Sequence, residues 1–285
     1  MQWRGRRGSN NIEDRRATSS GGRAGSIGSI GGVGVLVVVV VGYFLGVDLT
    51  PLLNDPGAGG PAAPVELTEA DKTAAAFVSV VLADTEAVWT KVFREQIGKP
   101  YDAPVLVLYK GVTQSPCGDA SGATGPFYCP GDQKVYLDTD FFTTMAQQLG
   151  AKGDFAMAYV VAHEVGHHVQ DELGILAKAN EIRAQVSEAE SNAISVRIEL
   201  QADCFSGIWA REVQRQFGTI EKGDFEEAVN AAKQIGDDTL QRNAGQRPMP
   251  HTFTHGTAAQ RSGWFIKGLN SGDLSACDTF NTDTL

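Results

Sequence analysis

The alternation of hydrophobic and polar residues predicts two strands and a series of helices in the C-terminal three quarters of the chain. Two runs, 103–111 and 133–142, are rich in β-branched and aromatic residues and are bounded by Gly, Pro or Asp, as is typical of strands. Apolar residues recur at helical spacing in five other segments: 69–97, 155–172, 186–217, 225–241 and 257–267. A few strands followed by many helices predict an α+β fold, mainly helical with a small sheet.

Two of these helices carry a signal for their first residue. Thr68 is followed three residues later by Asp71, and Thr257 by Gln260, which is the spacing at which two side chains cap a helix N-terminus. Gly98 follows Ile97, and Gly268 follows Lys267, at the positions where we expect the same two helices to end.

A different pattern near the N-terminus predicts a membrane anchor. No charged residue occurs between Arg23 and Asp48, and the apolar run 27–47 is as long as a helix that crosses a bilayer. Arginines before the run predict that 1–26 is a basic cytoplasmic tail and that the body lies outside the cytoplasm. A cleaved signal peptide is the alternative, although its apolar run should be shorter and end in a small-x-small site. We expect a Pro/Gly/Ala-rich linker over 48–66 and one domain over 67–285.

Composition and cysteine content change this picture in two ways. The net charge of -10 combines a basic N-terminal segment with an acidic remainder, and the acidic remainder argues against nucleic acid as a partner. The sequence does not indicate an oligomeric state. None of the four cysteines forms a C-x-x-C pair, so a thiolate zinc site is not expected. Cys117 and Cys129 flank an irregular loop and are expected to form a disulfide, with Cys204 and Cys277 paired by elimination. The alternative is four reduced, buried thiols.

The candidate chemistry lies in residues 163–167, which read H-E-x-x-H. On a helix, His163 and His167 project from one face and can bind one Zn²⁺ ion, while Glu164 can reach a metal-bound water as a general base. The alternative is a buried helix whose histidines are satisfied by hydrogen bonds. His168 points about 100° away from His167, which favours a supporting role over metal ligation.

A catalytic zinc site needs a third protein ligand. Glu199 and Asp203 lie four residues apart in a strongly apolar helical segment, so they share a face. We expect Glu199 to bind the metal and Asp203 to accept the N–H of a ligating histidine. Alternatively, Glu199 and Asp203 form a solvated acidic face of the helix. The third ligand is then Glu188, Glu190 or a later histidine.

Four segments of the chain, "AHEVGHHVQ", "ELQADCFSGIWA", "GPFYCPGDQKVYLD" and "FTHGTAAQR", resemble the bacterial putative neutral zinc metallopeptidase family. Its members are membrane-anchored relatives of the gluzincin peptidases, and the resemblance extends from the basic N-terminus to about residue 280. It implies a zincin-like fold in which an edge strand lies antiparallel to the substrate above the metal helix. We expect 132–138 to be that strand. The resemblance also supports Glu199 as the ligand and Asp203 as its partner.

The resemblance further implies a membrane-anchored, extracytoplasmic zinc peptidase that acts on proteins or peptides. Zn²⁺ on His163, His167 and Glu199 would activate water, and Glu164 would act as the base. By analogy with gluzincins, His255 is the expected donor to the oxyanion, with Tyr136 and Arg261 as alternatives. His255 could instead only fix its loop.

Two other functions are compatible with these residues. The first is a membrane-tethered interaction or assembly module with a structural or vestigial zinc site, which would have no use for a base such as Glu164. The second is a zinc amidase or esterase, because the same activated water attacks other acyl groups.

Overall fold

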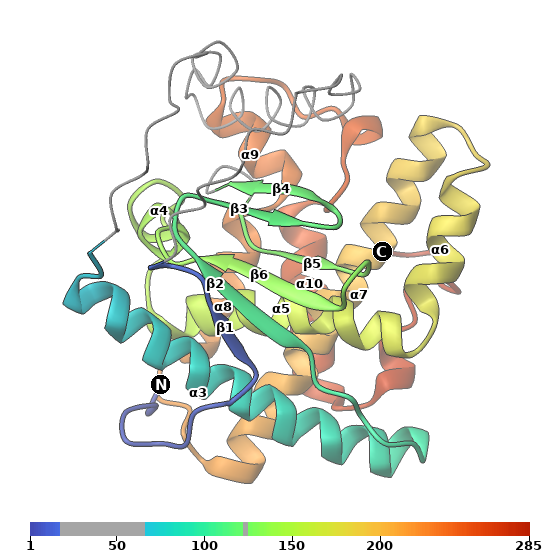
Figure 1. The fold of residues 1–285 in the computed structure, drawn as a ribbon. Helices are drawn as coiled ribbons and strands as arrows, with labels where there is room; N and C mark the ends of the chain where they lie inside the picture. Colours follow the sequence, from blue (N-terminus) through green and yellow to red (C-terminus); the bar gives the residue numbers. More distant parts are fainter. Residues whose placement is uncertain (18–65, 122–124) are drawn as a thin grey trace.

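The computed structural model describes residues 1–17, 66–121 and 125–285, which form a mainly helical fold with a small sheet (Figure 1). This architecture agrees with the α+β prediction. The expected membrane anchor at 27–47 and all but the last residue of the expected linker lie outside the described residues. Among the helices that are described, none combines the length and apolarity that a membrane crossing requires.

The main sheet has four strands in the order β1-β2-β6-β5. Strands β1, β2 and β6 run parallel to one another, and β5 pairs antiparallel with β6. The bounds of these strands are Ile12–Asp14, Val105–Tyr109, Lys134–Asp138 and Phe127–Cys129 in the order of the sheet. A separate hairpin consists of β3 and β4, Val112–Ser115 and Gly118–Ser121. The edges of the main sheet are therefore β1 and β5, and β6 is internal.

Successive residues of β2 and β6 face opposite sides of the sheet, and this alternation separates two apolar clusters. Leu106, Leu108, Val135 and Leu137 are buried in the main core with residues of the helices. Val107 and Tyr136 belong to a small cluster on the other face, which also contains Tyr109 and Cys129. All the helices that will carry candidate chemistry pack on the first face.

The helices α5 and α7 form the centre of the molecule, with α5 between the sheet and α7 (Figure 1). Helix α10 packs along α7. The helices have these bounds: α3 Glu69–Val92, continued by the π-helix η1 Phe93–Ile97; α4 Phe141–Gln147; α5 Asp154–Glu172; α6 Ile175–Arg183; α7 Glu188–Phe217; α8 Asp224–Gln234; α9 Asp237–Asn243; and α10 Ala258–Ser271. Short 3-10 helices η2 and η3 cover Pro250–Thr252 and Leu274–Cys277.

The predicted helix starts are confirmed, and one predicted end is wrong. Capping boxes form at Thr68 with Asp71 and at Thr257 with Gln260. Helix α10 does not end before Gly268 but continues to Ser271. A Cβ on Gly268 would lie 1.8 Å from the carbonyl oxygen of Cys204 in α7, so glycine is needed there for close helix packing and does not act as a stop.

Two other predicted elements differ from the structure. The strand expected over 133–142 ends at Asp138, whose carboxylate accepts the N–H of Asp140 in a turn that leads into α4. The helix expected over 225–241 is split into α8 and α9 at Gly236, whose backbone is extended. A Cβ on Gly236 would lie 2.3 Å from the backbone nitrogen of Ala258, so this break lets the start of α10 approach.

The first seventeen residues pack against the domain, whereas the rest of the predicted basic tail, 18–26, lies outside the described residues. Strand β1 pairs with β2, placing Ile12 opposite Leu106. Arg6 donates two hydrogen bonds of 2.6 Å to the buried carboxylate of Asp84 in α3. The arginines that suggested a cytoplasmic tail are thus partly used within the fold.

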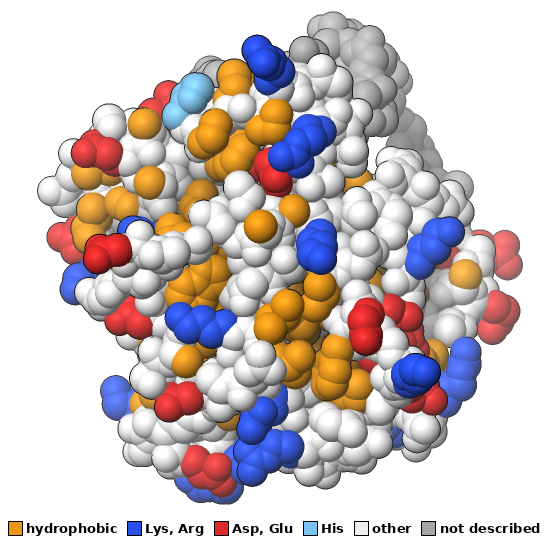
Figure 2. Space-filling view, turned by 180° about the vertical axis from the view of Figure 1, so that it is seen from behind, with side chains coloured by type: hydrophobic (Ala, Val, Ile, Leu, Met, Phe, Trp, Pro, Cys, Tyr) orange, Lys and Arg blue, Asp and Glu red, His pale blue; other side chains and the backbone are white. Residues whose placement is uncertain are grey.

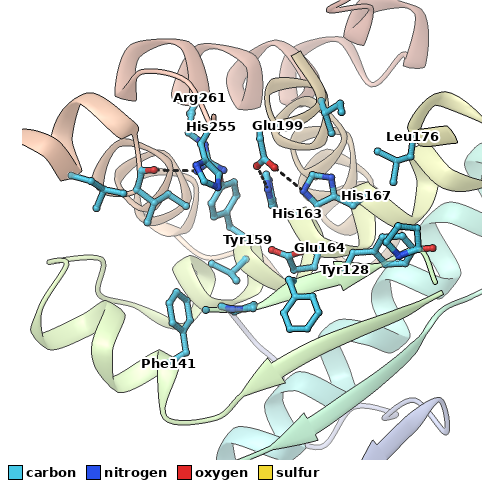
Figure 3. A pocket seen from close by; sticks show the side chains of 18 of the residues that line it. Tyr128, Phe141, Tyr159, His163, Glu164, His167, Leu176, Glu199, His255 and Arg261 are labelled. Carbon is cyan, nitrogen blue, oxygen red and sulfur yellow. Dashed lines mark hydrogen bonds and ion pairs between the residues drawn. The ribbon is translucent and has the colours of Figure 1, made fainter. Parts of the chain in front are cut away.

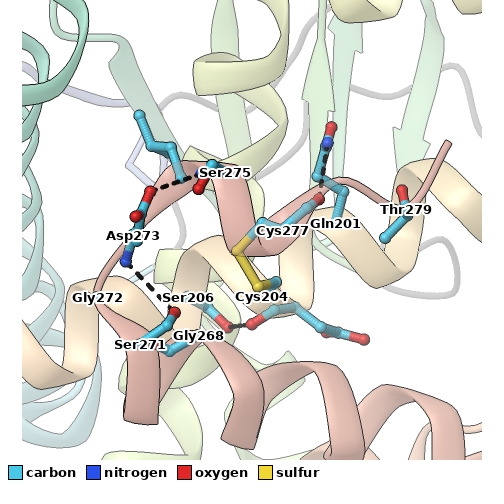
Figure 4. Close-up of a disulfide and its surroundings, with 12 residues drawn as sticks. Gln201, Cys204, Ser206, Gly268, Ser271, Gly272, Asp273, Ser275, Cys277 and Thr279 are labelled. Carbon is cyan, nitrogen blue, oxygen red and sulfur yellow. Dashed lines mark hydrogen bonds between the residues drawn. A yellow bond between two sulfur atoms is a disulfide. The ribbon is translucent and has the colours of Figure 1, made fainter. Parts of the chain in front are cut away.

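Both expected disulfides are present. Cys117 and Cys129 are bonded across the irregular loop, and Cys204 of α7 is bonded to Cys277 of η3 (Figure 4). The second bond joins residues 73 positions apart in the sequence and holds the C-terminal segment against α7. No free cysteine is present, and the alternative of four reduced thiols does not agree with this structure.

The surface opposite the view of Figure 1 has basic and acidic side chains interspersed, with groups of hydrophobic side chains between them (Figure 2). The large hydrophobic residues that are most exposed come from separate elements or loops: Val112, Ile182, Phe217, Met249 and Ile266. Scattered exposure of this kind is normal for a folded domain.

Candidate metal centre and active site

Helix α5 brings the two histidines of the H-E-x-x-H motif together. His163 and His167 lie one turn apart on one face, with ring centroids 4.8 Å apart. Between them, Gly166 faces α7, where an added Cβ would lie 3.1 Å from the carbonyl oxygen of Ala202. The absence of a side chain at Gly166 therefore lets α7 approach the histidines closely.

Helix α7 places a carboxylate against both imidazoles. Glu199 Oε2 lies 3.0 Å from His163 Nε2, and Glu199 Oε1 lies 3.4 Å from His167 Nε2 (Figure 3). One ligand atom from each of the three residues lies within 4.8 Å of the other two. Glu188 and Glu190, the alternative ligands, lie in the first turn of α7 and are exposed.

Asp203 stands behind His163, one turn after Glu199. Its Oδ1 lies 2.9 Å from His163 Nδ1 and accepts a hydrogen bond of 2.5 Å from the hydroxyl of Tyr159. The guanidinium of Arg261 donates to both carboxylate oxygens of Asp203. Asp203, Tyr159 and Arg261 are all buried. Because Asp203 occupies the Nδ1 side of His163, the Nε2 atom is left for a metal ion.

The charges around His163 favour its protonated form in the metal-free protein. Burial alone would lower the pKa of His163, but Asp203 and Glu199 outweigh burial and raise it to about 10. A metal ion that binds Nε2 would have to displace this proton, as is usual for histidine ligands.

The donor set fits zinc. Two imidazole nitrogens and one carboxylate are the protein ligands of many catalytic zinc sites, which leave a fourth position for water or substrate. Both Nε2 atoms face the carboxylate of Glu199, while the Nδ1 atom of His163 faces Asp203 and that of His167 faces Gln170. The orientation of both rings is therefore fixed by other residues.

Glu164 lies beside this group without belonging to it. Its side chain lines the same cavity as the two histidines and Glu199 (Figure 3). The residue is 7% exposed, and its carboxylate has no hydrogen bond or ion pair with another described residue. A nearly buried carboxylate without a partner is costly to keep in a fold, so its presence here points to use in chemistry.

His255 reaches the cavity from the loop before α10, and Asp237 at the start of α9 orients it. The His255 Nδ1 atom lies 3.2 Å from Asp237 Oδ1, and Asp237 Oδ2 accepts the backbone N–H groups of Thr254, His255 and Gly256. Desolvation lowers the pKa of His255, but the charges of Glu199 and Asp237 outweigh it, and the net shift is upward.

The two alternatives to His255 are placed differently. Arg261 lines the cavity, but Asp203 and the carbonyl of Ile235 already accept its N–H groups. Tyr136 lies on the other face of the sheet, where its hydroxyl donates to Asp132. Arg261 is therefore already engaged by Asp203, and Tyr136 is not part of the cavity wall.

The cavity in front of the metal group has a volume of about 510 Å³. Strand β5 contributes Phe127 and Tyr128 to its wall, whereas no residue of β6 lines it. The expectation that 132–138 is the edge strand is therefore wrong, because β5 covers the free side of β6. The wall also includes a set of apolar residues: Phe141, Leu149, Val160, Ile235 and Leu240.

Several residues that support the site were not identified from the sequence. Asp237, Tyr159 and Gln170 carry no motif that marks them, since their roles depend on contacts between helices. His168 is buried between Tyr128 and the backbone carbonyl of Asp102, which agrees with the supporting role expected for it.

Comparison with known proteins places this site in a family. A family model described as "Putative neutral zinc metallopeptidase" matches residues 1–280. The chain belongs to this family. The match includes the N-terminal residues that pack against the domain.

Relatives of the chain extend over most of its length. "Uncharacterized protein YpfJ" of Escherichia coli K12 is 47% identical over 286 positions, which cover 98% of this chain and 99% of the relative. "Uncharacterized protein Rv2575" of Mycobacterium tuberculosis H37Rv is 43% identical over 195 residues, or 65% of each chain. No solved structure matches the chain.

Proposed function

We propose that this protein is a zinc-dependent peptidase in which His163, His167 and Glu199 hold the metal and Glu164 is the general base. The observation that carries the proposal is the unpaired, nearly buried carboxylate of Glu164 in the cavity that the three candidate ligands share. A structural zinc site is closed by a fourth protein ligand and has no use for such a base.

The residues of the site can divide the reaction between them. When bound, zinc supplies a Lewis acid that polarises the scissile carbonyl and activates water. Glu164 takes a proton from the attacking water and delivers it to the nitrogen of the leaving amine. His255, held by Asp237, donates an N–H to the carbonyl oxygen as negative charge develops there.

The shape of the site favours an extended peptide as the substrate. One side of β5 pairs with β6, and among the described strands none pairs with its other side. A peptide can add to such an edge through its backbone hydrogen bonds, which do not depend on its sequence. The apolar part of the cavity wall would then accept a hydrophobic side chain near the scissile bond.

Metal loading and cleavage test this proposal directly. We expect the full-length purified protein to bind one zinc ion and to cleave an unfolded protein such as casein. A chelator should abolish cleavage, and added zinc should restore it. A zinc-loaded protein that cleaves neither casein nor a mixed peptide library would refute the peptidase and favour a binding module.

Replacement of Asp237 by asparagine is expected to lower kcat by roughly 10-fold, because an orienting partner of His255 is weakened. Asp237 raises the pKa of His255, so its donor form persists to higher pH in the wild type. The alkaline limb of the pH–rate profile should therefore move to lower pH in Asp237→Asn. The matched control is Asp238→Asn, because Asp238 caps α10 and does not contact His255. An unchanged alkaline limb in Asp237→Asn would exclude His255 as the donor.

We further propose that the domain works outside the cytoplasm, because two disulfides persist best in an oxidising compartment. Residues 1–17 pack on the domain and should share that compartment. Arg7 and Glu69 have exposed side chains and can each be replaced by cysteine in a chain with no free thiol. In intact cells, a membrane-impermeant maleimide should label Arg7→Cys and Glu69→Cys alike. Labelling of Glu69→Cys alone would instead support a cytoplasmic N-terminus.

A further inference from the structure

The two histidines of the metal group are held by partners of different chemistry. His163 faces the carboxylate of Asp203, whereas His167 Nδ1 lies 2.9 Å from the amide oxygen of Gln170. Gln170 is on the same helix as His167, one turn later, and is completely buried. Its amide nitrogen donates to the carbonyl oxygen of Ile198 at 2.8 Å and to the side-chain oxygen of Gln201 at 3.0 Å.

The network continues from Gln201 to the C-terminal disulfide. The amide nitrogen of Gln201 donates to the carbonyl oxygen of Cys277 at 3.0 Å, and Cys277 is bonded to Cys204 of α7 (Figure 4). Gln201, Cys204 and Cys277 are all buried. A continuous series of hydrogen bonds therefore joins the metal-ligand candidate His167 to a covalent cross-link of the fold.

The direction of each bond in this network is determined. The carbonyl oxygens of Ile198 and Cys277 can only accept, so both glutamines must turn their NH₂ groups toward them. The amide oxygen of Gln170 then faces His167, and His167 must carry its proton on Nδ1. The lone pair of the neutral imidazole is consequently on Nε2, which faces Glu199.

An amide suits this position better than a carboxylate. Glu164, Glu199 and Asp203 already surround the histidines, and Arg261 is bound to Asp203. A further buried negative charge at residue 170 would face the carbonyl of Ile198 and the amide oxygen of Gln201, and no cation is among the contacts of Gln170. A neutral amide fixes the tautomer of His167 without this cost.

We propose that Gln170 and Gln201 are positioning residues for His167. We further propose that the Cys204–Cys277 disulfide supports metal binding, because it fixes the backbone carbonyl of Cys277 that accepts the hydrogen bond of Gln201. This inference rests on the proposed function only in that His163, His167 and Glu199 hold the metal. Thr279, just beyond Cys277, also donates its hydroxyl to the carbonyl of Arg197. Loss of the disulfide should therefore loosen the C-terminal segment without releasing it.

The test measures zinc affinity and zinc dissociation in the full-length protein, by competition with a chromophoric chelator and with Zn²⁺ as the only ligand. Replacement of a partner that orients a ligating histidine lowers metal affinity by roughly 10–100-fold. We expect that loss for Gln170→Met, and roughly 3–10-fold losses for Gln201→Met and for Cys204→Ser/Cys277→Ser. Gln214→Met on α7 is the control, because the side chain of Gln214 is exposed and accepts the backbone N–H of Ile220, outside this network.

A double-mutant comparison separates this network from a general effect on stability. Once Gln201 is methionine, the link to Cys277 is broken, so removal of the disulfide should not weaken zinc binding further. If removal of the disulfide lowers zinc affinity equally in the wild type and in Gln201→Met, the disulfide acts only through the stability of the fold. Unchanged zinc affinity in Gln170→Met would overturn the inference. If the cysteine variant does not fold, Gln201→Met with the disulfide intact decides the question.

These outcomes are distinct from failure of the proposed peptidase. A wild-type protein that binds zinc but cleaves no peptide refutes the peptidase and leaves the affinity test valid. A wild-type protein that binds no zinc refutes both.

Discussion

Replacement of Glu164 by glutamine is expected to lower kcat/KM for peptide cleavage by roughly 10²–10⁴-fold while the protein still binds zinc. The amide has nearly the same shape as the carboxylate but cannot accept a proton from the attacking water at neutral pH. Glu164 has no hydrogen bond to another described residue, so its replacement should leave the fold unchanged. The zinc content of the purified variant and its rate on casein or a fluorogenic peptide check both parts of this expectation.

A matched control removes the same charge from the same helix. Glu172 is the last residue of α5 and does not line the cavity, so Glu172→Gln should cleave at the wild-type rate. If Glu164→Gln binds zinc and keeps more than about a tenth of the wild-type rate, another group must be the base. If it loses zinc as well as activity, Glu164 serves the metal and the proposed division of roles is wrong.

The metal helix could be predicted from the sequence because its chemistry is local. His163, Glu164 and His167 lie within five residues, and helical geometry alone places both imidazoles on one face. Glu199 and Asp203 could also be predicted, since two acidic residues one turn apart in an apolar helix need partners inside the protein. The contact of the two histidines with the two acidic residues then follows from the packing of α5 on α7 at Gly166.

The remaining parts of the site depend on contacts that leave no local pattern. Strand β5 has only three residues and follows Pro126, so it carries too little alternation to be recognised as the edge strand. Asp237 meets His255 because the helical segment is interrupted at Gly236. The close approach of Ala258 requires this interruption, and the sequence next to Gly236 does not indicate it. Long-range packing decides both features.

The arginines of the N-terminal segment make contacts within the fold that the sequence analysis did not include. An excess of arginine before a long apolar run is typical of a cytoplasmic tail. In the fold, Arg6 is paired with Asp84, and Arg16 is paired with Asp14 and donates to the carbonyl of Asp71. Asp84 and Asp71 lie 55 to 78 residues further along the chain, so counting charges within the segment does not reveal these contacts.

Replacement of Arg261 by methionine is expected to cause the largest loss of stability, roughly 3–5 kcal/mol, because it removes the guanidinium from the buried carboxylate of Asp203 and leaves His163 and Tyr159 as the remaining described partners of that carboxylate. Arg261 is 2% exposed and Asp203 is fully buried, and two of the arginine N–H groups donate to the two carboxylate oxygens. Burial alone would raise the pKa of Asp203, but Arg261 and His163 outweigh it and hold the pKa below its ordinary value of 3.8. The pair is therefore ionised at neutral pH. Its contribution to the free energy of unfolding is lost only when the pH falls below 3.8 and then through the still lower pKa of Asp203 in the folded state.

Denaturant unfolding of the zinc-free protein measures this effect without the contribution of metal binding. Arg211→Met is the matched control, because Arg211 also joins α7 to α10, but its acceptors among the described residues are the neutral backbone carbonyls of Leu269 and Asn270. We expect that control to lose about 1 kcal/mol or less, as for hydrogen bonds near the surface. In Asp203→Asn/Arg261→Met the buried negative charge at residue 203 is absent, so part of the stability should return relative to Arg261→Met. Equal unfolding midpoints for Arg261→Met and the wild type would show that Asp203 does not need Arg261, and that Tyr159 and His163 alone keep its charge in the core.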